Sequence, residues 1–198
     1  MGYFDEAHEC SSKALALSHD NELFIEPRAR TMLDLIELFG RRDPEGESEA
    51  VERLEKSIED LREGGATFGV AFFIFRLAEV LLARGDVARA ELALGTAGEL
   101  IESLDEHLWL SEIQRIRGEL LGRCGAVDEA AASLEEALAT ARRQEAHSFE
   151  LRALLGLARL PDPGVPVHDR LREVVESLAD GPATRDLAAA RDLLASAP

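Results

Sequence analysis

WLSEIQRIRGELLGRCGAVDEAAASLEEALATARRQ, residues 109–144, contains two helical patterns joined by a tight turn. In the first half, Ile113, Ile116 and Leu120 recur at three- and four-residue steps, which places them on one face of a helix. Gly125 is typical of a helix C-terminus, because glycine adopts the left-handed conformation there at little cost. Asp128 and Glu129 then lie at the N-terminus of the next helix, where the helix dipole favours negative charge. The stretch therefore predicts a helical hairpin.

Small residues within this hairpin follow the spacing of a tetratricopeptide repeat, which asks for glycine and alanine at the helix contacts and glycine at the turn. The six positions are filled, in order, by Gly118, Leu121, Gly125, Ala130, Leu134 and Ala137. We expect Gly118 and Ala130 to lie where the two helix axes approach each other closely. A similar turn at Gly85 precedes Gly125 by 40 residues, which is longer than the usual period of about 34.

The recurrence of this spacing predicts one all-α domain over 1–198: a tetratricopeptide-like right-handed superhelix of antiparallel helix pairs with a C-terminal capping helix. Few β-branched and aromatic residues support an all-helical fold. The expected spans are a half repeat at 2–19, pairs at 20–64, 68–104, 108–145 and 148–179, and a cap at 184–196 that begins at Thr184. Because the half repeat lacks its first helix, we expect either that the chain is part of a longer protein or that a partner covers this N-terminal face.

The charge balance argues against nucleic acid as a direct partner. There are 39 acidic and 22 basic residues, a net charge of −17, whereas nucleic-acid binding needs a basic surface. No apolar run is long enough to span a membrane and no secretory signal pattern is present, so we expect a cytoplasmic protein without membrane contact. Cys10 and Cys124 lack CxxC spacing, and we expect them to be reduced and mostly buried.

Catalytic and metal-binding motifs do not occur in the sequence. It contains no phosphate-binding GxxxxGK[ST] loop, no GxSxG elbow and no HExxH helix. The five histidines are scattered singly at 8, 19, 107, 147 and 168. We therefore expect no enzyme activity, no metal site and no cofactor.

A groove lined by the first helix of each pair is the predicted binding site. By repeat position its residues are Phe72, Phe75, Arg76, Glu79, Glu112, Arg115, Glu119, Arg152, Leu155 and Arg159. The four arginines would form a basic ladder, and guanidinium groups bind carboxylates in a bidentate way, which suits an acidic peptide. The alternative is that the arginines pair with Glu79, Glu112, Glu119 or Glu150 as a structural network. Phe72, Phe73 and Phe75 cannot all face one side of a helix, so at least one of them should lie outside the core. That phenylalanine would either anchor a partner or pack against the neighbouring repeat.

A family resemblance rests on EIQRIRGELL at 112–121, ATARRQ at 139–144, SFELRA at 148–153, DG at 180–181 and TRDL at 184–187. Over residues 70–198 these segments resemble the C-terminal helical repeats of large bacterial signalling proteins. Those proteins carry a cyclase-like or transcription-activator domain and a nucleotide-binding ATPase module ahead of their tetratricopeptide-like repeats. The resemblance implies a sensor or interaction module without the catalytic parts.

The sequence thus favours a non-catalytic scaffold that binds a protein or peptide, as the regulatory part of a signalling or transcription regulator. One alternative is a small-molecule sensor, which predicts an enclosed pocket of a few hundred Å3 rather than an open channel. Another is self-association of the chain through its N-terminal face.

Overall fold

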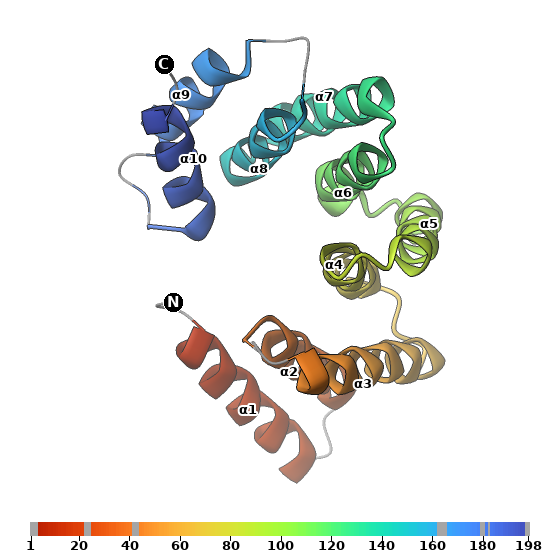
Figure 1. Ribbon diagram of the computed structural model, residues 1–198. Helices are drawn as coiled ribbons and strands as arrows, with labels where there is room; N and C mark the ends of the chain where they lie inside the picture. Colours follow the sequence, from red (N-terminus) through yellow and green to blue (C-terminus); the bar gives the residue numbers. More distant parts are fainter. Residues whose placement is uncertain are drawn as a thin grey trace. The chain divides into compact units, whose positions relative to one another are not determined.

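A computed structural model describes residues 4–21, 25–40, 44–161, 166–178, 181 and 183–196 (Figure 1). Within these residues the chain is helical and contains no strand, so the predicted all-α class is confirmed. The helices are α1 (Phe4–Asp20), α2 (Glu26–Gly40), α3 (Pro44–Glu63), α4 (Val70–Ala83), α5 (Val87–Ser103), η1 (His107–Trp109, a short 3-10 helix), α6 (Leu110–Arg123), α7 (Val127–Arg143), α8 (His147–Ala158), α9 (Val167–Ser177) and α10 (Arg185–Ser196). By their internal contacts they form two compact units, Met1–Glu106 and His107–Pro198.

In unit 1, residues 1–106, each helix packs against the next one along the chain, and α2 also contacts α4. Helix α4 is the most apolar of the described helices and supplies more of the core than any other helix of the unit, because ten of its residues are buried between α3 and α5. Pro27 lies in the first turn of α2, where a missing backbone N–H costs nothing. Glu106, which follows the C-terminus of α5, caps the N-terminus of α4. Both of its carboxylate oxygens accept the Gly69 N–H, at 3.1 and 3.0 Å.

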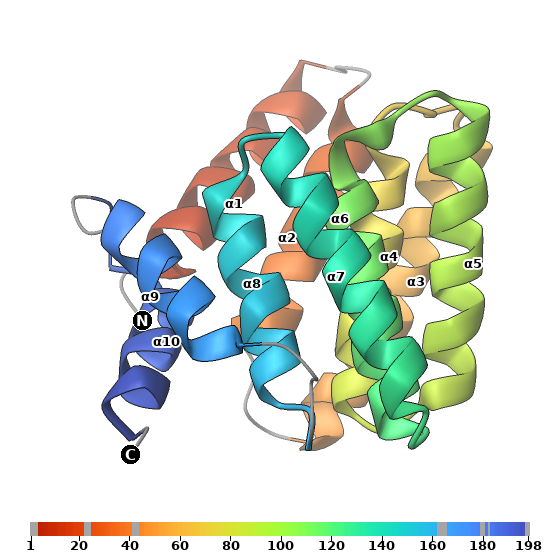
Figure 2. The same ribbon diagram turned by 90° about the horizontal axis from the view of Figure 1, so that it is seen from above.

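In unit 2, residues 107–198, α8 packs on both helices of the α6–α7 hairpin, and α10 packs on both α8 and α9 (Figure 2). Helix α10 therefore packs on the α8–α9 pair in the same way that α8 packs on the α6–α7 pair. It begins as predicted, because the Thr184 hydroxyl accepts the Leu187 N–H at 3.1 Å. Its Leu187 and Ala190 are buried in the same apolar cluster as Leu154 and Leu171.

The turns between helices are spaced 20 residues apart. A left-handed residue ends a helix at Gly65, Gly85, Asp105, Gly125 and Glu145. In each case the following N–H donates to the carbonyl five residues earlier, as in a Schellman motif: Ala66 to Leu61, Asp86 to Leu81, Glu106 to Ile101, Ala126 to Leu121 and Ala146 to Ala141. Two of these turns thus give the 40-residue spacing that the sequence predicted, and the helical hairpin is the repeating element.

The predicted close approach at Gly118 is present. A methyl group added at Gly118 would lie 2.6 Å from Leu134 Cγ and 3.1 Å from the Ala130 carbonyl oxygen. One added at Gly156 would lie 2.7 Å from Leu134 Cδ2. The Leu134 side chain of α7 therefore fills the space that glycines leave on α6 and α8, and the whole of Leu134 is buried.

Cys10 and Cys124 are free thiols, but the prediction that they are buried is wrong, because both are exposed. Cys124 is the C-cap residue of α6, one position before the turn glycine, where a side chain faces solvent. Parts of the predicted spans fall outside the described residues: 2–3 of the half repeat, 22–24 and 41–43 of the pair at 20–64, and 162–165 and 179 of the pair at 148–179. Among the described helices, none is long and apolar enough to cross a membrane.

Candidate binding surfaces

The predicted groove residues of unit 1 lie on α4 and are packed rather than open. Phe73 and Phe75 are both buried, at 1% exposure, whereas Phe72 is half-buried. The Phe72 ring lies edge-on to each of the other two rings, with centroid distances of 5.4 Å to Phe73 and 5.5 Å to Phe75. One phenylalanine of the three therefore leaves the core, as expected, and it packs on its neighbours. Arg76 forms an ion pair with Glu79 and stacks over the Phe39 ring of α2 at 4.3 Å.

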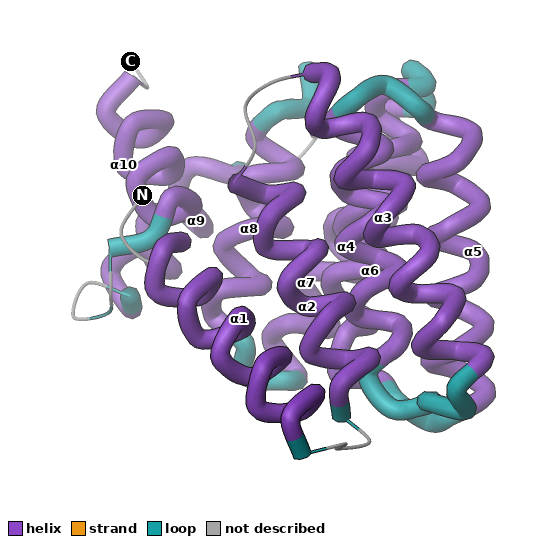
Figure 3. Tube along the Cα trace, turned by 90° about the horizontal axis from the view of Figure 1, so that it is seen from below, coloured by secondary structure: helices purple, strands orange, loops and turns teal. Residues whose placement is uncertain are grey.

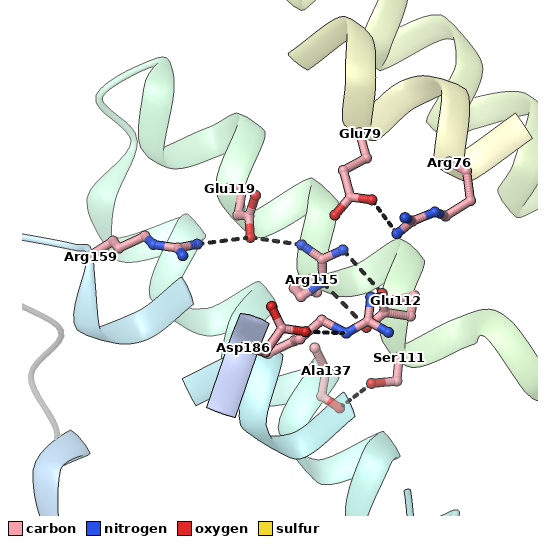
Figure 4. A network of polar contacts seen from close by, with 10 residues as sticks. Arg76, Glu79, Ser111, Glu112, Arg115, Glu119, Ala137, Arg159 and Asp186 are labelled. Carbon is pink, nitrogen blue, oxygen red and sulfur yellow. Dashed lines mark hydrogen bonds and ion pairs between the residues drawn. The ribbon is translucent and has the colours of Figure 1, made fainter. Parts of the chain in front are cut away.

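The predicted residues of unit 2 form a single chain of alternating charges across α6, α8 and α10 (Figure 4). Arg115 is at its centre, with only 3% of its surface exposed. Its guanidinium lies 3.1 Å from a carboxylate oxygen of Glu112 and 2.8 Å from one of Glu119. The next ion pair in this series of charges joins Glu119 Oε1 to Arg159 Nη1, at 3.8 Å. The central pair is thus held in a bidentate, hydrogen-bonded geometry that compensates for its burial.

The other end of this charge chain runs through Arg152. Its Nη1 lies 2.7 Å from Glu112 Oε2, and its Nε lies 3.6 Å from Asp186 Oδ2 at the start of α10. That Nε is buried and makes no hydrogen bond to a described residue. Each arginine of the predicted ladder is therefore paired with a carboxylate, which is the structural alternative of the sequence analysis. Release of these arginines to an acidic ligand stays a prediction.

A second surface, which the sequence did not single out, is a groove of about 470 Å3 in unit 1. We call it the α3–α5 groove: α3 and α5 form its walls, α4 forms its floor, and it is open to solvent rather than enclosed. The backbone course of these three helices can be followed in Figure 3. Each helix contributes one stripe at helical spacing. The lining is Glu55, Ile58, Glu59 and Arg62 from α3, Ile74, Leu77 and Leu81 from α4, and Arg89, Leu92, Ala93 and Thr96 from α5.

One end of the α3–α5 groove is crossed by an ion pair. The Arg89 guanidinium donates to Glu55 across the gap and to Asp86 Oδ2 at 3.3 Å on its own helix. The hydrogen bond to Glu55 is the main cause that raises the pKa of Arg89 above its usual value, against the opposing effect of partial burial. This ion pair marks one end of the groove, which we call its closed end.

The floor of the α3–α5 groove is apolar and its mouth is not fully covered. Ile74, Leu77 and Leu81 are at most 6% exposed, whereas Leu92 on the α5 wall is 73% exposed. The sequence contained the signal for this floor, because Ile74, Leu77 and Leu81 recur at helical spacing. That spacing equally fits a helix face buried within a repeat, so it could not distinguish a groove from a core.

Metal-ligating residues do not gather elsewhere: the part of the chain that the structure describes holds no cluster of three His, Cys, Asp or Glu side chains that could bind a metal ion. Comparison of the chain with protein-family models, curated proteins and solved structures finds no match. The α3–α5 groove and the charge chain of unit 2 are thus the two surfaces on which a functional proposal can be based.

Proposed function

We propose that this protein is a non-catalytic scaffold that binds a helical segment of another protein in the α3–α5 groove. The observation that carries the proposal is the open groove itself, with three buried aliphatic side chains along its floor. Grooves of this kind accept the apolar face of an amphipathic helix, whose contact residues recur at i, i+3, i+4 and i+7. Each wall stripe covers eight residues, or seven helical steps, so the groove is about 10 Å long, which corresponds to two turns of a bound helix.

The wider setting is also a proposal. The 40-residue recurrence of turns and of small contact residues supports a tetratricopeptide-like right-handed superhelix. The family resemblance supports a regulatory or interaction part of a bacterial signalling or transcription protein. Under both proposals the scaffold itself carries out no reaction and acts through the partner that it holds.

A display library of random helical peptides, selected on the full chain, tests the proposal. We expect enriched peptides to carry apolar residues at the four helical positions and to lose binding on Ala93→Trp, whose indole fills the groove above its floor. Ala132→Trp is the matched control, because Ala132 is an exposed residue of α7 outside the groove. Peptides that bind wild type and Ala93→Trp equally well would rule out the groove as the binding site.

A small-molecule sensor is the second candidate, and one observation favours it. The groove volume of about 470 Å3 lies within the range of about 300–1,000 Å3 that is typical of ligand pockets. Its open mouth and exposed Leu92 favour a peptide, since a small ligand is usually buried over most of its surface. A thermal-shift screen of amphiphilic compounds separates the two: a compound that stabilises wild type and leaves Ala93→Trp unchanged would support the sensor.

A further inference from the structure

We propose that the partner helix in the α3–α5 groove is cationic, with an apolar face against α4 and a lysine or arginine opposite Glu59. This inference rests on the proposed function and adds the chemistry of the partner. It is carried by the composition of the groove floor, the charges on the α3 wall and the distribution of charge along the chain.

The apolar floor is not something that the repeat requires. Helix α6 is the counterpart of α4, 40 residues later, and at the positions of Ile74 and Leu77 it carries Gln114 and Arg117. Arg117 is exposed in unit 2, and its hairpin packs as closely as that of α4. An isoleucine and a leucine at these positions of α4 therefore give unit 1 an apolar stripe that packs between α3 and α5 and forms the groove floor.

The α3 wall offers one carboxylate to a partner at mid-length. Of its two acidic lining residues, Glu55 is bound by Arg89 across the closed end. Glu59, one turn further along α3, is exposed and has no ion-pair partner among the residues that the structure describes. It lies beside the apolar floor, so a cation at the edge of a bound helix's apolar face would reach it.

The position of Arg62 favours one orientation of the bound helix. Arg62 follows Glu59 by three residues and lines the end of the groove away from the Arg89–Glu55 pair. A helix C-terminus carries partial negative charge and is stabilised by a nearby cation. The partner therefore runs parallel to α3, with its C-terminus beside Arg62 and its N-terminus towards the closed end.

The surrounding charge also selects a cationic partner. Unit 1 contains 24 acidic and 11 basic residues, against 15 and 11 in unit 2, so most of the net charge of −17 belongs to unit 1. Helix α3 contributes further exposed carboxylates next to the groove wall: Glu49, Glu52, Asp60 and Glu63. A field of this sign speeds encounter with basic segments and disfavours acidic ones.

The α5 wall leaves room for a helix. Its groove-facing residues between Arg89 and Thr96 include the small Ala93. Leu92 at the rim would be covered by a bound helix, which removes the largest exposed aliphatic side chain of α5 from water.

Three synthetic peptides of about 14 residues test the inference on the full chain by fluorescence anisotropy. All share one leucine face, and the positions at the edge of that face, which would lie beside Glu59, carry lysine, glutamine or glutamate. At about 150 mM NaCl we expect the lysine peptide to bind about tenfold more tightly than the glutamine peptide, and the glutamate peptide to bind most weakly.

Charge-reversal variants of neighbouring residues locate the effect. We expect Glu59→Lys to weaken the lysine peptide by about tenfold while binding of the glutamine peptide changes by twofold or less. Asp60→Lys makes the same change in net charge one residue away, on an exposed position outside the groove lining, and should alter binding by about twofold or less. Circular dichroism confirms that each variant is folded.

The outcomes separate the two proposals. If lysine and glutamine peptides bind equally, the cationic partner is excluded. If Asp60→Lys weakens binding as much as Glu59→Lys, the pairing of the cation with Glu59 is excluded. In either case, loss of binding on Ala93→Trp would keep the groove. If Ala93→Trp and Thr96→Arg both leave every peptide bound as tightly as wild type, the groove function itself is excluded.

Discussion

At the scale of single residues, packing in unit 2 depends on the contact between Leu134 and two glycines. Leu134 Cγ and the Ala130 carbonyl leave no room for a methyl group on Gly118. At Gly122, on the same helix, an added methyl would lie 3.1 Å from Leu160 Cδ2, the end of a partly exposed side chain, and 3.7 Å from Ala130 Cβ, which is an ordinary contact. These two glycines therefore differ in what surrounds them although both are in α6.

We expect Gly118→Ala to destabilise unit 2 by about 1–2 kcal/mol, because overpacking outweighs the gain of about 1 kcal/mol in helix propensity. Gly122→Ala should be neutral or stabilising by about 0.5 kcal/mol. Urea denaturation followed by fluorescence reports on this unit, since Trp109 is the single tryptophan and packs against Phe149 at 6.2 Å between ring centroids. Equal midpoints for the two variants would contradict the close contact at Gly118.

At the scale of elements, α4 and α6 occupy the same place in successive hairpins but use different chemistry. Phe72 and Phe75 of α4 correspond, 40 residues later, to Glu112 and Arg115 of α6. The first pair is an edge-on ring contact and the second a buried ion pair, with Glu112 at 1% exposure. Buried ion pairs add little net stability over apolar residues of similar size, although loss of one partner is costly.

We therefore expect Arg115→Met to destabilise unit 2 by roughly 3 kcal/mol, since Glu112 would keep only Arg152 as its partner. The double variant Glu112→Phe with Arg115→Phe, which transfers the α4 pair to α6, should recover to within about 1 kcal/mol of wild type. Urea midpoints from Trp109 fluorescence measure both. A double variant that is less stable than Arg115→Met would mean that the charge chain contributes specific stability, for which the apolar pair is no substitute.

The elements also show how far the sequence could be interpreted. The hairpin at 109–144 was predictable because Gly118 and Gly125 mark a close contact and a turn by residue type alone. The 20-residue turn spacing was not, because Asp105 and Glu145 adopt a left-handed conformation that their residue types do not indicate. Arg115 and Arg152 lie on helices where the sequence predicted them, α6 and α8, but the pairing of their guanidinium groups depends on distances between helices. The α3–α5 groove depends on the separation of two helices that a sequence pattern does not encode.

At the scale of the whole molecule, charge is distributed unevenly between the two compact units. Unit 1 has 24 acidic and 11 basic residues, and unit 2 has 15 and 11. Excess charge of one sign destabilises a compact state through self-repulsion, and salt screens that repulsion. Salt also weakens favourable ion pairs, and both units contain such pairs. The difference in excess charge between the units therefore decides which unit gains more stability from added salt.

We expect a change from about 20 mM to about 500 mM NaCl to slow amide hydrogen exchange in the helices of unit 1 more than in those of unit 2. Mass spectrometry of the intact chain, with peptides assigned to α3–α5 and α6–α8, measures both units in one sample. Replacement of Glu49, Glu52 and Asp60 by lysine on the exposed face of α3 should reduce the salt effect in unit 1 and leave unit 2 unchanged. Equal protection gains in both units, or a salt effect that survives the three replacements, would show that like-charge repulsion in unit 1 does not limit its stability. Because the same carboxylates give unit 1 the field that favours a cationic partner, a stabilising response to the three lysines would also indicate that this part of the molecule sacrifices stability for recognition.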